Sequence, residues 1–145
     1  MKSAIPLCLL SLLLGCTAIH VEPVEREAGL AHVCIEEDPK VIVADFLTIL
    51  RAGFRRHGIS TELYKDAAPP HCEFTLTYDA RQSWDMVSYL SHAELRLEHR
   101  GDQIAYATYH LRNRGGYALY SKWKSTRTKM GPVIDRLLKA YPPKP

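Results

Sequence analysis

Residues 72–82 read CEFTLTYDARQ, and their apolar and polar side chains alternate strictly along the chain. One face carries Cys72, Phe74, Leu76, Tyr78 and Ala80, and the other carries Glu73, Thr75, Thr77, Asp79 and Arg81. This period of two predicts a strand that is buried on one side. Residues 91–99 (SHAELRLEH) and 103–112 (QIAYATYHLR) repeat the pattern. Strands with one polar face are typical of an antiparallel sheet that is covered on its other face.

The loop between residues 99 and 103 sets which side chains of the following strand meet the leucines at 95 and 97. A three-residue loop aligns Ala105 and Ala107 with those leucines, whereas a two-residue loop aligns Ile104 and Tyr106. We expect the alanine face to point inwards, because small side chains leave room for a helix to lie close to the sheet.

Two amphipathic segments predict helices that cover this sheet. The first has Asp38 as N-cap and Pro39 as first residue, and it ends at Gly58, which suits a C-terminal cap. The second starts at Pro132, or at Thr126 if Pro132 kinks it. Further strands are expected at residues 32–38, 59–65 and, shorter, 117–123. The predicted fold is therefore a two-layer α+β domain, with a largely antiparallel sheet of about five or six strands and two long helices on one face.

The N-terminus carries an export signal. Lys2 precedes the apolar run IPLCLLSLLL at residues 5–14, which has about half the length needed to span a membrane. Residues 13–16, LLGC, resemble the lipobox of bacterial lipoproteins. The resemblance implies cleavage between Gly15 and Cys16 and covalent diacylglyceryl and N-acyl lipid on Cys16. Because Thr17 is not aspartate, it also implies the outer membrane and a domain that faces the periplasm. An ordinary signal peptide is the alternative.

Processing removes Cys8 and modifies Cys16, so the mature chain keeps two free thiols, Cys34 and Cys72. An oxidising compartment favours their pairing as a disulfide. The alternatives are a metal pair with a nearby histidine such as His71, or a reactive thiol.

The organisation that follows is a signal peptide at residues 1–15, a lipidated N-terminus and tether at 16–32, one periplasmic domain at 33–141 and a disordered tail at 142–145. The formal net charge is +3 and basic residues are dispersed, which argues against nucleic-acid binding. Residues 111–129 hold six basic residues and no acid. That stretch is either a solvated loop or a surface for anionic lipid headgroups or an acidic partner.

Common catalytic motifs are missing from the sequence: no G-x-S-x-G elbow, H-E-x-x-H helix or phosphate-binding loop occurs. The seven histidines are scattered singly, so we expect surface positions and no metal site. The least ordinary stretch is RQSWDMVSYL, residues 81–90. Its candidate binding residues are Arg81, Trp84, Asp85 and Tyr89, because these residue types are frequent in binding hot spots. Alternatively, the stretch is a strand bend whose indole covers the sheet edge.

Residues 72–85 (CEFTLTYDARQSWD), 89–98 (YLSHAELRLE) and 128–141 (TKMGPVIDRLLKAY), with the lipobox, resemble a family of small uncharacterised lipoproteins of Gram-negative bacteria. The resemblance implies no activity or cofactor. We expect a membrane-anchored, non-enzymatic accessory factor that binds another envelope protein through its open sheet face or the Trp84 region. A small-molecule or lipid-binding periplasmic module is the alternative, and an enzyme would need converging ionisable groups in a pocket.

Overall fold

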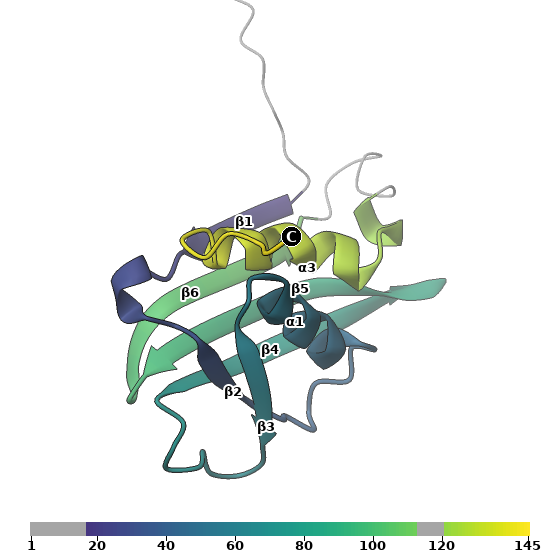
Figure 1. The fold of residues 1–145 in the computed structure, drawn as a ribbon. Helices are drawn as coiled ribbons and strands as arrows, with labels where there is room; N and C mark the ends of the chain where they lie inside the picture. The colour runs from purple at the N-terminus through teal and green to yellow at the C-terminus, as the bar shows by residue number, and fades with distance from the viewer. Residues whose placement is uncertain (1–16, 113–120) are drawn as a thin grey trace, which may run out of the picture.

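Six strands form one mixed sheet in the computed structural model, which describes residues 17–112 and 121–145 (Figure 1). In spatial order they are β1 (Thr17–Glu22), β6 (Asp102–Leu111), β5 (Val87–His99), β4 (Phe74–Asp85), β2 (His32–Glu36) and β3 (Ser60–Tyr64). The described helices are the 3-10 turn η1 (Arg26–Ala28), α1 (Phe46–Arg56) and α3 (Thr126–Leu137). The α+β class is confirmed.

The sheet has an antiparallel part and a parallel part. Strands β1, β6, β5 and β4 pair antiparallel, whereas β2 pairs parallel with both β4 and β3. The expected antiparallel order therefore applies to four strands and misses two. The reason is the connection through α1, which returns the chain to the end of the sheet where β2 began, so that β3 runs in the same direction as β2.

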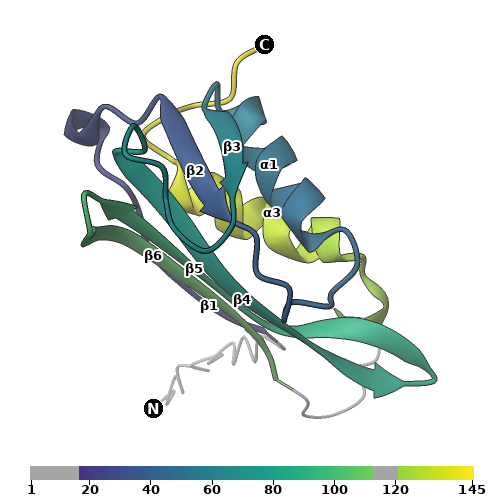
Figure 2. The ribbon, with the colours of Figure 1, turned by 90° about the horizontal axis from the view of Figure 1, so that it is seen from below.

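The core lies between one sheet face and the two long helices, which occupy the same side of the sheet (Figure 2). The apolar side chains of β4 from Phe74 to Ala80 are buried, which confirms the expected alternation. The helices contribute Phe46, Ile49, Leu50, Phe54, Met130, Val133, Ile134 and Leu137 to the same core.

The β5–β6 turn confirms the expected face but not the expected loop. Leu95 and Leu97 lie opposite Ala107 and Ala105, as expected. The loop, however, consists of Arg100 and Gly101, both with positive φ, and a register shift follows between residues 97 and 98. A two-residue loop with an additional β-bulge thus gives the alignment that a three-residue loop would give without one.

The tether expected at residues 16–32 is wrong for residues 17–32. Residues 17–22 form β1, which pairs with β6 along its whole length, and Val24 and Leu30 are buried. The Val24 N–H also donates to the carbonyl of Leu137, at 3.0 Å. None of the six residues of β1 is fully buried, so its sequence carries a weak periodic signal. The signal peptide at residues 1–15, with Gly15, and the lipidation site Cys16 lie outside the described residues.

Helix α1 begins later than expected. Asp38 is not its N-cap: the carboxylate accepts a hydrogen bond from the Lys40 N–H at 2.8 Å and forms a local turn. The helix starts at Phe46. Its expected end is confirmed, since Gly58 has φ +75° and donates to the Arg55 carbonyl.

Helix α3 begins at Thr126, the earlier of the two expected starts, with Ser125 as N-cap. The Ser125 side chain accepts from the Thr128 N–H at 3.2 Å. The helix continues through Pro132, which has no N–H to donate to the preceding turn. Residues 121–123 are helical, which contradicts the strand expected there, and residues 117–120 lie outside the described residues.

The C-terminal segment packs against the end of α1. The N–H of Lys144 donates to the Arg56 carbonyl at 3.0 Å, so residues 142–145 do not form a disordered tail. His57 is not a surface histidine, because its ring is buried beside Asp135, with Nε2 at 2.8 Å from the carboxylate. Arg56 pairs with the same carboxylate. These contacts join the end of α1 to α3.

Candidate interaction surface at the end of the sheet

The β4–β5 hairpin runs on past α1 and α3 (Figure 2), and the residues at its end carry exposed apolar side chains. Trp84, Met86 and Val87 are 75%, 79% and 43% exposed. Single apolar side chains on a surface are ordinary, but three within four positions of a protruding turn indicate an interaction surface. The exposure of Trp84 also contradicts the alternative in which its indole covers the sheet edge. Residues 84–87 are called the hairpin tip below.

Charged groups join the hairpin, from Asp85 at its tip to Tyr89 at its base, to the segment that precedes α3. Lys122 Nζ donates to Asp85 Oδ2 at 2.7 Å, and this hydrogen bond raises the pKa of Lys122. The ammonium of Lys122 lies 5.8 Å from the ring centroid of Tyr89, and that of Lys129 lies 5.4 Å from it. Tyr89 is therefore a structural contact of the hairpin base rather than a free binding group.

Lys129 is a buried cation within this arrangement. Its Nζ donates to the carbonyls of Leu90 and Lys122, at 3.1 and 3.2 Å. Burial lowers its pKa to about 8, because the charged form loses water. The two carbonyl contacts orient the start of α3 relative to β5.

Arg81 lies apart from the other candidates. By strand alternation its side chain falls on the opposite face from Trp84, where its Nε donates to Asp79 at 3.0 Å. Its carbonyl accepts from the Ser91 hydroxyl at 3.1 Å, beside the bulge in the hairpin. The structure thus brings Trp84, Asp85 and Tyr89 to one end of the sheet and leaves Arg81 on its outer face.

Three exposed apolar residues at this end were missed by sequence reasoning: Met86, Val87 and Trp123. The sequence does contain a signal for this surface: Met86 and Val87 are two apolar residues at the turn between two strands of alternating pattern. We expected residues 81–90 to be a connection, whereas β4 and β5 extend through them as far as Asp85 and Val87.

Strand β1 starts at the same end of the sheet. Thr17 pairs with Leu111, and the neighbouring His110 pairs with His92, which lies opposite Arg81 at the base of the hairpin. Figure 1 shows the start of β1 and the hairpin directed to one end of the molecule. Of the helices in residues 17–112 and 121–145, none is long and apolar enough to cross a membrane.

The expected disulfide is present at the opposite end of β4. Cys34 in β2 and Cys72, two residues before β4, are bonded with a Cα–Cα distance of 5.9 Å. The alternative of a reactive thiol does not apply to this bonded pair. Cys34 is fully buried, and the bond joins β2 to the segment that leads into β4.

Comparison with known proteins identifies a fold but no family. No family model matches the sequence, and no curated protein matches it either. Two solved structures are similar in fold: the PelC dodecamer from Paraburkholderia phytofirmans and a leucine-to-methionine variant of the same dodecamer. Each has a TM-score of 0.51 and 13% sequence identity, over 81% of this chain and 97% of that chain.

Proposed function

We propose that the chain is a lipid-anchored protein of the bacterial outer membrane that faces the periplasm and acts as an accessory factor, by binding rather than by catalysis. In this proposal Cys16 carries the acyl chains and the hairpin tip enters the membrane interface beside them. The observation that carries the proposal is that β1 begins at the end of the sheet toward which the apolar hairpin tip points.

The short distance between anchor and domain supports this orientation. Thr17 already belongs to β1, so only one residue, with an extended length of about 3.5 Å, would separate a lipid on Cys16 from the sheet. The domain would therefore rest on the membrane surface instead of hanging from a tether. A second membrane contact would strengthen attachment, since stable anchoring generally needs two signals.

The chemistry of the hairpin tip suits the membrane interface. Tryptophan is favoured at the boundary between acyl chains and headgroups, and Met86 and Val87 would add apolar surface next to Trp84. Trp123, which is also exposed, and Lys122 lie in the segment that contacts the tip. Lys122 is 11% exposed and pairs with Asp85, so it would hold this segment against the tip rather than meet headgroups.

The outer face of the sheet is then left for a protein partner. It carries polar side chains such as Glu94 and Arg96, whose ion pair has a length of 2.8 Å, and Tyr106, whose ring lies 5.8 Å from the Arg96 guanidinium. The solved neighbours were crystallised as dodecamers. A second copy of this chain is accordingly the first partner to test, by mass photometry of the detergent-solubilised protein.

Two measurements test the membrane part of the proposal. Mass spectrometry of the chain purified from a Gram-negative envelope should find an N-terminus at Cys16 with diacylglyceryl and acyl groups. For the tip, Trp123→Phe leaves Trp84 as the remaining tryptophan of two. Vesicles with brominated acyl chains should then quench Trp84 fluorescence. An unquenched Trp84 in the lipidated chain contradicts the proposed orientation, and Trp84→Phe reports on Trp123 as the comparison.

A second candidate function is binding of a small molecule. A cavity of about 680 Å³ opens between α1 and the loop after β2, with Phe46 and Tyr78 in its lining. Its lining holds five carboxylates against two ammonium groups, those of Lys40 and Lys65, and this excess favours a cationic or amphiphilic ligand. Broadening of the Phe46 and Tyr78 ring resonances by an alkylammonium compound below its micelle concentration would support this function.

A further inference from the structure

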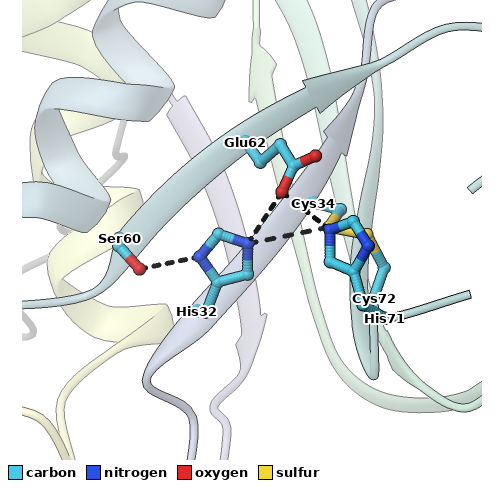
Figure 3. The surroundings of a disulfide bond; sticks show 6 residues. All are labelled: His32, Cys34, Ser60, Glu62, His71 and Cys72. Atoms are coloured by element: carbon cyan, nitrogen blue, oxygen red, sulfur yellow. Dashed lines mark hydrogen bonds and ion pairs between the residues drawn. A yellow bond between two sulfur atoms is a disulfide. The ribbon is translucent and has the colours of Figure 1, made fainter. Parts of the chain in front are cut away.

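Three side chains converge on one face of the sheet edge beside the disulfide (Figure 3). The Nε2 atoms of His32 and His71 lie 3.4 and 2.9 Å from the same oxygen, Oε2 of Glu62. The three side chains are 42%, 61% and 40% exposed, so an ion from solvent can reach them.

The fold brings these residues together by strand pairing and by the disulfide. In the parallel β2–β3 pair, His32 lies opposite Ser60 and Cys34 lies opposite Glu62. Residues two apart in a strand share a face, so His32 and Glu62 are on the same side as Cys34. The bond from Cys34 to Cys72 then brings the preceding residue, His71, to that side.

Two contacts of the Ser60 hydroxyl bear on the tautomer of His32. When the Ser60 hydroxyl donates to the Ala31 carbonyl, 3.3 Å away, its oxygen accepts from His32 Nδ1, 2.7 Å away. A neutral His32 in that tautomer presents the lone pair of Nε2 to the Glu62 oxygen at 3.4 Å, and the same atom lies 3.8 Å from Cys34 Sγ. Two acceptors at this separation are stable only with a cation between them, either a proton on the ring or a metal ion.

The carboxylate is ready to bind a cation. Its Oε2 atom lies 2.9 Å from His71 Nε2 and 3.4 Å from His32 Nε2, and the side chain is 40% exposed to solvent. The sulfur atoms of Cys34 and Cys72 are also close, since one atom each of Cys34, Glu62, His71 and Cys72 lie within 4.8 Å of one another. In the disulfide these sulfurs are not thiolates and are weak ligands.

We propose that His32 Nε2, Glu62 Oε2 and His71 Nε2 bind one Zn²⁺ ion in the disulfide-bonded chain. Two imidazoles and one carboxylate are a common zinc donor set, whereas Ca²⁺ and Mg²⁺ prefer oxygen ligands. Tetrahedral coordination with bond lengths of about 2.0 Å places ligand atoms about 3.3 Å apart. The two separations that the carboxylate oxygen makes, 2.9 Å to His71 Nε2 and 3.4 Å to His32 Nε2, bracket that value. The contact from Ser60 to Nδ1 is the type of second-shell hydrogen bond that orients a zinc-bound histidine.

The sequence did not predict this site because His32 and His71 are far apart in the chain and neither has a second ligand at helical or strand spacing. The alternative that paired the two cysteines with His71 named the correct neighbourhood. It assigned the metal to thiols that are joined in a disulfide, however. The ion would join β2, β3 and the loop before β4.

The test is titration of the chain with ZnCl₂ by isothermal calorimetry, after purification without a histidine tag, removal of metal with a chelator and confirmation that free thiols are absent. We expect saturable 1:1 binding. Glu62→Gln and His71→Gln should each weaken it by about 100-fold or more, and Ser60→Ala by about 10-fold. His20→Gln is the matched control, because His20 forms a similar 3.3 Å pair with Glu22 on another strand and its loss should leave affinity unchanged.

A second measurement keeps the test valid if a variant folds poorly. In the unaltered chain, Zn²⁺ should shift the imidazole NMR signals of His32 and His71 while those of His20 stay in place. The proposal is overturned if no saturable binding is found below 1 mM Zn²⁺. A dissociation constant of 1 mM corresponds to a binding free energy on the order of −4 kcal/mol. Unweakened binding by both Glu62→Gln and His71→Gln also overturns it. In either case the cluster is an ion pair only.

Discussion

Reduction of the Cys34–Cys72 disulfide should lower the free energy of unfolding by about 4 kcal/mol. The bond closes a loop with a sequence separation of 38 residues. In the chain-entropy model a loop of that length restricts the unfolded chain by about 13 cal/mol/K, which corresponds to roughly 4 kcal/mol at 25 °C. A domain of this size has a total stability of about 5–15 kcal/mol, so the loss is a large fraction of it.

Urea denaturation followed by circular dichroism measures this difference. Three samples separate the crosslink from side-chain packing: the oxidised chain, the same chain with a dithiol reductant, and Cys34→Ala/Cys72→Ala. The reduced chain keeps both sulfur atoms and loses only the bond, whereas the double variant also loses the fully buried Cys34 side chain and should be less stable still. If the reduced chain is within 1 kcal/mol of the oxidised chain, the loop-entropy explanation is wrong.

Two further predictions concern the helix layer. A Cβ added at Gly53 would lie 2.8 Å from Ile134 Cγ2. In Gly53→Ala this overlap should lower the free energy of unfolding by about 1–3 kcal/mol, and the higher helix propensity of alanine should offset roughly 1 kcal/mol of that loss. In an Ile134→Ala background the same change should instead stabilise, which a double-mutant cycle by urea denaturation would detect. Lys129 has a folded pKa of about 8, below the 10.5 of the unfolded chain, so the unfolded chain binds more protons in that window. The free energy of unfolding should therefore rise by about 1.5 kcal/mol between pH 8 and 9.5. Lys129→Met should abolish most of that rise. If the free energy of unfolding of the variant rises with pH as steeply as before, Lys129 is not the group responsible.

The strands with one buried face could be predicted from the sequence because their pattern is local. Phe74, Leu76 and Tyr78 alternate with polar residues, and burial of every second residue follows directly. The β5–β6 turn shows the limit of this reasoning. A bulge after Leu97 has no distinct signature in the residue pattern, so the correct face was inferred from an incorrect loop length.

Features that depend on topology could not be read in the same way. The order of strand, helix and strand around α1 was recognised, but its consequence, parallel pairing of β2 and β3, was not drawn. That omission also hid the side-chain cluster, since only the parallel register places Glu62 opposite Cys34. At the hairpin, Trp84 was recognised as unusual from its residue type. The exposure of Met86 depends on how far β4 and β5 extend beyond the helices.

The hairpin tip and the histidine cluster lie at opposite ends of the sheet, so the two proposals can fail separately. Thr75 pairs with Cys34 at one end of β4, and Trp84 lies nine residues further along the strand, about 30 Å away. At that distance substitutions should act independently. Trp84→Phe should leave zinc affinity unchanged, and His71→Gln should leave quenching of Trp84 by brominated lipid unchanged. A change in either cross-measurement would mean that both ends respond to one structural perturbation, and neither local interpretation would then stand.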